Sequence, residues 1–421
     1  TIGSHRPERV HREAQRGADI AMFIFTSGTT GLPKAAKITN SRALGLMRVF
    51  VTAVGVEKSD RILLTLPLYH ATGGMCGVGC AINSGGTLIL KRKFSASHFW
   101  QEAIDSKATM LVYIGELGRY LMNLPPSPQE KQHSIVKGFG NGLRPDVWAE
   151  FVERTGIKRL VEFYGSTEGN VNFFNLDGKI GAVGRIPRVL RGRLRARVVK
   201  FDVETEQPIR GPNGFCIEAA PDEVGEAIGP ISNEPRERFE GYFNKEQTEK
   251  KILTDVFKKG DRYFRTGDLM KLDADGYVYF VDRVGDTFRW KSENVSTTEV
   301  EAALSSFPGI EHAIVYGVEV PHNDGRAGMA AIVPAGEVDL GKLSAHLAAA
   351  LPSYARPLFL RLKRETETTG TFKYRKVDLV EEGYDPAKVS EPLYFADPLS
   401  GEFRPVDADA FTAIQSGGMR F

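Results

Sequence analysis

The chain has little of several features that would mark it as a particular class of protein. It contains three cysteines in 421 residues, too few for a disulfide-linked scaffold, which suggests a reducing compartment. The formal net charge is only +2, and no basic stretch carries interleaved aromatic residues, so nucleic-acid binding receives little support. Internal repeats and low-complexity linkers are also absent. A chain of this length can form two or more hydrophobic cores.

Long hydrophobic runs are missing as well. The longest weakly polar stretch, residues 71–90, contains six glycines and is too polar for a membrane-spanning helix. The basic residues 91–93 that follow it could touch anionic lipid, but a solvated loop explains them better. The first 19 residues are rich in Arg, Glu and His, unlike a signal peptide. We therefore expect a cytoplasmic protein, and a peripheral membrane contact stays open.

The cysteines give no sign of a metal site. Cys76 and Cys80 lie in an apolar, glycine-rich run, and no second pair stands at metal-binding spacing. Small buried thiols explain this pattern better than a metal centre.

Short apolar runs alternate with longer mixed segments in the first half of the chain. Residues 21–25, 61–66 and 87–90 predict buried strands, and residues 41–54 predict a helix. This alternation favours layered α/β architecture.

Shorter strands and turns prevail after about Leu194. Residues 271–280 predict a hairpin that turns at Asp275-Gly276. Residues 296–299 form a capping box that predicts a helix running to about Ser306. A strand at 313–318 and a helix at 341–351 should follow, with the helix stopped by Pro352. We expect a large α/β domain over residues 1–284 and a small, mobile α+β domain over residues 285–421.

The strongest functional pattern follows the first predicted strand. Residues 26–34 combine four hydroxyl side chains, two glycines and a lysine, which together can surround a phosphate group. A Walker A loop is excluded because Pro33, not glycine, precedes the lysine. A ligand-free Ser/Thr/Gly turn is the plain alternative. The phosphate-binding candidates are Thr26, Ser27, Gly28, Thr29, Thr30, Gly31 and Lys34.

This loop resembles the phosphate loop of the acyl-adenylate-forming superfamily, which includes acyl-CoA synthetases, peptide-synthetase adenylation domains and luciferases. Residues 164–168, Tyr-Gly-Ser-Thr-Glu, follow in that family's order. A carboxylate beside a hydroxyl suits Mg²⁺ and phosphate. The resemblance implies that Glu168 holds Mg²⁺ and that Thr167 contacts phosphate, with Tyr164 and Gly165 beside the nucleotide. A polar turn at a strand end is the alternative for this pentapeptide alone.

Two further motifs complete the nucleotide site that the resemblance implies. Asn141, Gly142 and Leu143 are similar to the family's adenine platform. Residues 263–268 are similar to the motif whose aspartate, here Asp268, accepts from both ribose hydroxyls, since one carboxylate can serve a diol. Arg283 matches the arginine that also reaches ribose. Each motif, taken alone, is equally explained as a turn.

The resemblance also implies a moving C-terminal domain. The hinge lies two residues beyond the arginine, at Gly285, where glycine allows free rotation. Lys373 matches the catalytic lysine, which would neutralise charge where the carboxylate attacks the α-phosphate; a surface lysine is the alternative. Arg289, Trp290, Lys291 and Ser292 occupy the segment that faces the thioester site. Glycine is usual where Ser292 stands, which bears on the backbone conformation there.

The acyl pocket and the narrower family follow from resemblance too. His70, Gly73 and Gly74 lie where the family lines its acyl pocket, and glycines there would leave room for a long tail. A buried structural imidazole is an equal explanation for His70. Residues 94–97, 113–117, 286–291 and 316–320 resemble the very-long-chain acyl-CoA synthetases, also called fatty acid transport proteins.

Members of that family have a substantial portion before the phosphate loop, and here about two dozen residues precede it. We therefore expect the first domain to lack part of its N-terminal side, with part of the acyl tunnel wall and any membrane anchor. The resemblance implies a ligase that uses ATP, Mg²⁺ and CoA on a long or very long fatty acid. An acyl-AMP ligase serving a carrier protein, a non-catalytic fatty-acid transport or binding component, and an inactive fragment remain alternatives. The sequence does not indicate the oligomeric state.

Overall fold

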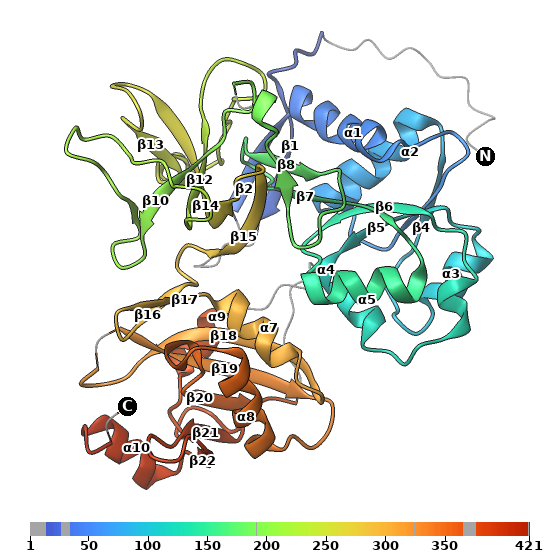
Figure 1. The fold of residues 1–421 in the computed structure, drawn as a ribbon. Helices are drawn as coiled ribbons and strands as arrows, with labels where there is room; N and C mark the ends of the chain where they lie inside the picture. The colour runs from blue at the N-terminus through green and yellow to red at the C-terminus, as the bar shows by residue number, and fades with distance from the viewer. Residues whose placement is uncertain (1–13, 27–33, 191, 324, 365–375, 420) are drawn as a thin grey trace.

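A computed structural model describes residues 14–26, 34–190, 192–323, 325–364, 376–419 and 421. Two parts of the chain are visible in Figure 1, a larger one that runs to β15 and a smaller one that contains the C-terminus. Each part has its own buried core, and the second core contains only residues from Phe288 onward. The domain boundary between residues 284 and 285 stays a prediction.

The larger part is built on a mixed six-stranded sheet. Its strands run parallel except for the last, which is antiparallel to its neighbour. Central strands are buried on both faces, which explains their continuous apolar runs. In order across the sheet they are β4 (Thr87–Leu90), β3 (Arg61–Leu64), β5 (Met110–Ile114), β6 (Lys137–Asn141), β7 (Arg159–Gly165) and β8 (Asn172–Asn175).

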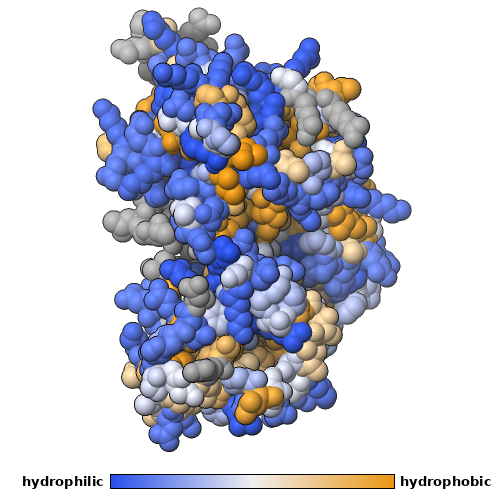
Figure 2. All heavy atoms as spheres, turned by 60° about the vertical axis from the view of Figure 1, so that its left-hand side comes forward, coloured by the Kyte–Doolittle hydropathy of each residue, from blue (hydrophilic) through white to orange (hydrophobic). Residues whose placement is uncertain are grey.

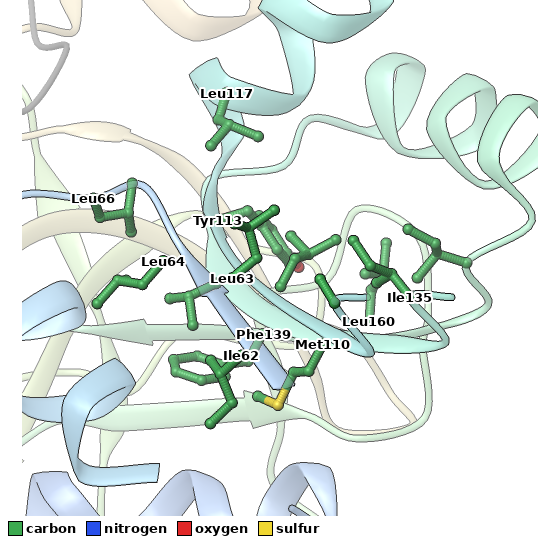
Figure 3. Packing of buried hydrophobic residues seen from close by; sticks show 14 of the residues in the cluster. Ile62, Leu63, Leu64, Leu66, Met110, Tyr113, Leu117, Ile135, Phe139 and Leu160 are labelled. Atoms are coloured by element: carbon green, nitrogen blue, oxygen red, sulfur yellow. The ribbon is translucent and has the colours of Figure 1, made fainter. Parts of the chain in front are cut away.

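Helices cover both faces of this sheet (Figure 1). Phe50 on the first helix stacks on Phe139 of β6, with ring centroids 4.0 Å apart. Figure 3 shows Ile62 and Phe139 on one side of the sheet and Leu63 and Tyr113 on the other. Full burial of each such side chain stabilises the fold by about 1.5–3 kcal/mol. The helices are α1 (Asn40–Val54), a π-helix (Ala71–Gly77), α2 (Val78–Ser84), α3 (Phe99–Asp105), α4 (Gly115–Met122) and α5 (Pro145–Thr155).

A second, antiparallel sheet of seven strands completes the larger part, together with a separate two-stranded hairpin, β1 (Ile20–Thr26) and β2 (Lys34–Thr39). The predicted turn at Asp275-Gly276 is confirmed, and Gly276 has φ 87°. In order the strands are β11 (Gln207–Pro208), β10 (Arg197–Asp202), β12 (Gly225–Pro230), β14 (Arg262–Leu272), β15 (Tyr277–Arg283) and β9 (Gly184–Arg185), with β13 (Ile252–Thr254) also on β14 and helix α6 (Lys245–Glu249) preceding β13.

The smaller part is an α+β unit. It begins with the short hairpin β16 (Phe288–Trp290) and β17 (Glu293–Val295). The helix start that the capping box predicts is confirmed, because the Ser296 hydroxyl accepts from the amide of Glu299 at the N-terminus of α7. The remaining elements are α7 (Thr297–Ser305), β18 (Ile310–Glu319), β19 (Arg326–Pro334), α8 (Leu340–Ala350), β20 (Phe359–Leu362), α9 (Lys376–Glu382), β21 (Leu393–Ala396), β22 (Phe403–Pro405) and α10 (Ala408–Gln415).

The two parts contact each other through side chains near α4, α5 and α7. Arg144, which caps α5, donates from Nη2 to the carbonyl of Thr298 at 2.7 Å. The rings of Tyr120 on α4 and His312 on β18 lie edge to face with centroids 5.3 Å apart. Burial lowers the pKa of His312 to about 4, so this imidazole is neutral at physiological pH.

One prediction of burial is wrong. Residues 21–25 do form a strand, but Met22, Phe23 and Phe25 of β1 are exposed. The reason is that β1 belongs to a two-stranded hairpin, so Ile24 alone in this strand is buried against its neighbours. Apolar side chains gather on the upper part of the face in Figure 2, which belongs to the larger part of the molecule. Strand β4 is likewise an edge strand and is only partly buried.

Cys76 and Cys80 are buried free thiols, as expected. Burial raises the pKa of each to about 12. Among the described residues, no helix combines the length and apolar character needed to cross a bilayer.

Candidate active site

The phosphate-loop candidate lies between the two strands of the first hairpin in the sequence. Thr26 ends β1 and Lys34 begins β2; the two residues are paired in the ladder, and the Thr26 hydroxyl donates to the Lys34 carbonyl at 3.3 Å. Residues 27–33, which carry the other candidates Ser27, Gly28, Thr29, Thr30 and Gly31, lie outside the described residues. The ammonium of Lys34 lies 5.8 Å from the centre of the Tyr242 ring.

Tyr242 brings this hairpin to Glu168. Its segment adds to β2, because Lys37 donates to the carbonyl of Gly241 and Phe243 donates to that of Ala35. The Tyr242 hydroxyl then donates to Oε1 of Glu168 at 2.6 Å. Burial, with the Glu168 charge, raises the pKa of Tyr242, so its phenol keeps the proton.

Arg42, on α1, holds the backbone of the loop that carries Thr167 and Glu168. Its Nε donates to the carbonyl of Thr167 at 2.9 Å, and its Nη2 donates to that of Ser166 at 3.0 Å. The same Nη2 also donates to the carbonyl of Gly169. Desolvation lowers the pKa of Arg42, against the charges of Glu168 and Glu240.

The ribose candidates form a second group. Asp268 and Arg283 are paired across β14 and β15, with 3.9 Å between Nε and Oδ1. The hydroxyl of Tyr164, at the end of β7, donates to Oδ2 of Asp268. Burial, with the Asp268 charge, raises the pKa of Tyr164. The structure therefore brings these three candidates together from two sheets.

A lysine that the sequence did not single out lies between the two groups. Lys251 donates from Nζ to the carbonyl of Thr266 at 3.0 Å. Burial lowers its pKa, while the charges of Glu168 and Asp268 act in the opposite direction. Lys251 therefore interacts electrostatically with both Glu168, on the phosphate side, and Asp268, on the ribose side.

The adenine-platform candidates lie where β6 ends. Gly142 follows Asn141 with φ 81°, and the amide of Leu143 donates to Oε1 of Glu162 at 2.9 Å. The hydroxyl of Tyr113 is 2.8 Å from Oε2 of the same carboxyl group. Glu162 is fully buried, and burial raises its pKa to about 8. A neutral carboxyl group therefore supports this platform at neutral pH.

The acyl-pocket candidates have a structural explanation. Cβ atoms placed on Gly73 and Gly74 would stand 2.5 and 1.9 Å from the carbonyl oxygens of Pro67 and Leu68. Close packing against the protein's own backbone thus accounts for both glycines, and their place in an acyl pocket stays a prediction. His70 precedes the π-helix and is partly exposed; its place in an acyl pocket stays a prediction.

The hinge candidate and the CoA-region candidates form a turn-rich connection. Gly285 has φ 89°, a conformation that favours glycine. Lys291 and Ser292 have φ 52° and 67°, so the backbone keeps a left-handed, glycine-like turn despite the serine. Arg289 pairs with Glu204 at 3.2 Å. Trp290 is buried.

Three acidic residues make hydrogen bonds and ion pairs at the start of the smaller part. Asp282, buried at the end of β15, accepts from the amide of Thr297 at 2.6 Å and from its hydroxyl at 3.0 Å. Lys376 pairs with Asp286 at 3.2 Å and with Glu301 at 3.4 Å. The candidate catalytic residue Lys373 falls among residues 365–375, outside the described residues.

No cluster of three or more His, Cys, Asp or Glu side chains with metal-binding geometry occurs in the described part of the chain. Glu168 is a single carboxylate with one oxygen engaged by Tyr242. This donor set fits Mg²⁺ that arrives with a nucleotide, because Mg²⁺ keeps several waters and uses one or two carboxylates plus phosphate oxygens.

Comparison with known proteins places this geometry in a family. The family model described as AMP-binding enzyme matches residues 3–226, more than half of the chain. The chain belongs to the AMP-binding enzyme family. A second model, AMP-binding enzyme C-terminal domain, matches residues 299–373.

Curated relatives of this AMP-binding enzyme are named fatty acid transport proteins. Long-chain fatty acid transport protein 2 of Rattus norvegicus is 47% identical over 397 residues, covering 94% of this chain and 64% of the relative. Long-chain fatty acid transport protein 3 of Homo sapiens is 44% identical over 405 residues, covering 96% and 59%. The chain thus spans about three fifths of the length of these relatives.

Solved structures confirm the fold class. ATP-bound MatB from Rhodopseudomonas palustris superposes with a TM-score of 0.71 at 25% identity, covering 87% of this chain and 69% of that one. O-succinylbenzoate coenzyme A synthetase of Bacillus subtilis, in complex with ATP and magnesium ion, gives 0.69 at 23% identity, covering 90% and 73%. The AMP-binding enzyme described here therefore has the predicted large α/β and small α+β architecture.

Proposed function

We propose that this chain, as the whole or part of its protein, activates a long-chain or very-long-chain fatty acid in two steps. The carboxylate and ATP give acyl-adenylate and pyrophosphate, and the acyl-adenylate and CoA then give acyl-CoA and AMP. The observation that carries the proposal is that Lys34, Glu168 and Asp268, far apart in sequence, all act electrostatically on Lys251, while Tyr242 contacts both Lys34 and Glu168.

Each group of residues has a role in this proposal. Lys34 and the loop 26–34 bind the triphosphate with charge and donors. Glu168 holds Mg²⁺, which neutralises phosphate charge when bound, and Thr167 donates to phosphate. Asp268 accepts from the ribose hydroxyls and Arg283 lies beside it. Residues 141–143 face the adenine. Lys373 neutralises the charge that develops at the attacked α-phosphate.

The choice of acid and acceptor is supported by the relatives. The curated relatives are named for long-chain fatty acids, and O-succinylbenzoate coenzyme A synthetase is named for coenzyme A. In this proposal the CoA thiol binds near Arg289–Ser292, and Gly285 is the hinge about which the smaller part rotates between the two steps. The protein is cytoplasmic and can contact a membrane surface peripherally.

The test is ATP–pyrophosphate exchange and AMP release over a series of fatty-acid chain lengths, with and without CoA. We expect acid-dependent exchange that is strongest with long chains, and AMP release that needs CoA. Absence of acid-dependent exchange would refute adenylation and favour a transport or binding role. Exchange without CoA-dependent AMP release would indicate transfer to a carrier protein.

The role of Lys373 has its own measurement. Lys373→Ala should lower the adenylation rate by on the order of a hundredfold or more, because removal of one electrostatic donor costs that much in other enzymes. The nearby surface variant Arg364→Ala is the control and should keep the parental rate. A Lys373→Ala enzyme that adenylates at the parental rate would remove this lysine from the mechanism.

A further inference from the structure

The contact between Arg42 and the loop after β7 is unusual in its composition. One guanidinium donates to three carbonyls, those of Ser166, Thr167 and Gly169, within a single four-residue turn. The turn is closed internally as well, because the amide of Gly169 donates to the Ser166 hydroxyl at 3.1 Å. With its carbonyls held, the turn has little freedom to reorient its peptide planes.

Fixed peptide planes determine where the side chains of Thr167 and Glu168 point. A guanidinium is planar and offers five donors in a rigid fork, so it can define several carbonyl positions at once. A lysine ammonium at the same place would carry the same charge without that fork. The geometry of Arg42, rather than its charge alone, therefore controls the direction of the Glu168 carboxylate.

Both connections of Glu168 lead back to the same strand. Arg42 lies in the first turn of α1, which continues directly from β2, and β2 begins at Lys34. Tyr242, which holds the Glu168 carboxylate, lies in the segment that pairs with β2. The backbone of the Glu168 loop and its side chain are thus both attached to the strand that starts at the phosphate-loop lysine.

We infer that Arg42 is a positioning residue for the triphosphate and metal end of the site, and that it sets the distance between Lys34 and Glu168. This inference rests on the proposed function. Arg42 donates to three carbonyls of the loop that carries Thr167 and Glu168, so we expect its effect at the β- and γ-phosphate end of the nucleotide.

The test compares two nucleotides that differ at that end. Binding of Mg·ATP, without fatty acid, and binding of AMP are measured by calorimetry for the parental protein and for Arg42→Lys. We expect the dissociation constant of Mg·ATP to rise about tenfold or more, the cost of one or two hydrogen bonds from a charged group. The dissociation constant of AMP should change by less than about twofold, since AMP lacks the outer phosphates.

The matched control is Arg48→Lys, an exposed arginine on the same helix, which should leave both constants at parental values. A second readout is the magnesium concentration that half-saturates exchange, which should rise in Arg42→Lys while the KM for fatty acid stays unchanged.

Two results would overturn the inference. Equal weakening of Mg·ATP and AMP would show that Arg42 supports the whole domain, and unchanged binding of both would show that its fork is not needed. A parental protein that binds neither nucleotide would instead refute the proposed function, and the inference with it. Failure of the proposed function can be distinguished from failure of the Arg42 inference, because it is seen in the parental protein without any substitution.

Discussion

At the residue scale, the site contains carboxyl groups in different surroundings. Glu168 faces the cations Arg42 and Lys251 and accepts from a phenol. Glu162 has no cation among the groups that shift its pKa and is fully buried, so its pKa is raised to about 8. The first is suited to metal and phosphate, and the second to holding a backbone turn as a neutral acid.

Glu162 should make stability depend on pH. Its folded pKa is raised above the unfolded value, so the folded state binds more protons between about pH 4.5 and 8, and the free energy of unfolding should fall as pH rises through that window. The loss is on the order of a few kcal/mol. Glu162→Gln mimics the neutral acid and should flatten this slope in urea unfolding followed at several pH values.

The exposed variant Glu153→Gln is the control for Glu162 and should keep the parental slope. A Glu162→Gln protein with the parental pH dependence would contradict the assignment of a neutral carboxyl group beneath residues 142 and 143.

At the scale of single elements, local signals proved dependable. The capping box at Ser296, the turn at Gly276 and the strand preceding Lys34 depend on neighbours within a few residues, so the sequence predicts them. Arg42 and Tyr242 could not be predicted in the same way. They meet the Glu168 loop across 125 and 74 positions, and single Arg or Tyr residues leave no local pattern.

The exposure of β1 and the close backbone contacts of Gly73 could not be predicted from local sequence either. Whether an apolar strand is buried depends on how many strands flank it, and whether a glycine leaves open space depends on which backbone passes by. The resemblance located the nucleotide motifs, but the hydrogen bonds that orient them come from residues outside those motifs.

Helix α7 offers a test of a cap. The Ser296 hydroxyl accepts from the amide of Glu299 and donates to the carbonyl of Val281. Ser296→Ala should lower the free energy of unfolding by about 1 kcal/mol, measured by urea denaturation. Ser296→Thr keeps both interactions and should lose much less. An alanine variant as stable as the parent would show that the buried neighbour Asp282 caps the helix by itself.

At the scale of the whole molecule, specific side-chain contacts join the two parts. They include the hydrogen bond from Arg144 to Thr298, the ring contact between Tyr120 and His312, and the ion pair between Arg289 and Glu204. Each of these contacts joins a residue of the larger part to a residue of the smaller part. Together they favour the relative orientation seen in Figure 1.

Removal of the Arg144 guanidinium should loosen that orientation. Arg144→Ala deletes the hydrogen bond to Thr298, and the radius of gyration from small-angle X-ray scattering should increase, with faster proteolysis near residues 284–287. Arg159→Ala, an exposed arginine elsewhere on the larger part, is the control. Unchanged scattering and proteolysis in Arg144→Ala would show that the tie between Asp282 and Thr297 holds the orientation alone.

The hydrogen bond between Asp282 and Thr297 can report on motion between the two parts. Thr297 is buried, and its amide donates to the Asp282 carboxylate of β15 at 2.6 Å. A rotation about Gly285 that separates Thr297 from Asp282 would expose this amide to water. The rate of its deuterium uptake would therefore report how often the two parts separate. A ligand that favours one orientation of the two parts would lower or raise the exchange rate of the Thr297 amide. That rate would report the preferred orientation without an activity assay.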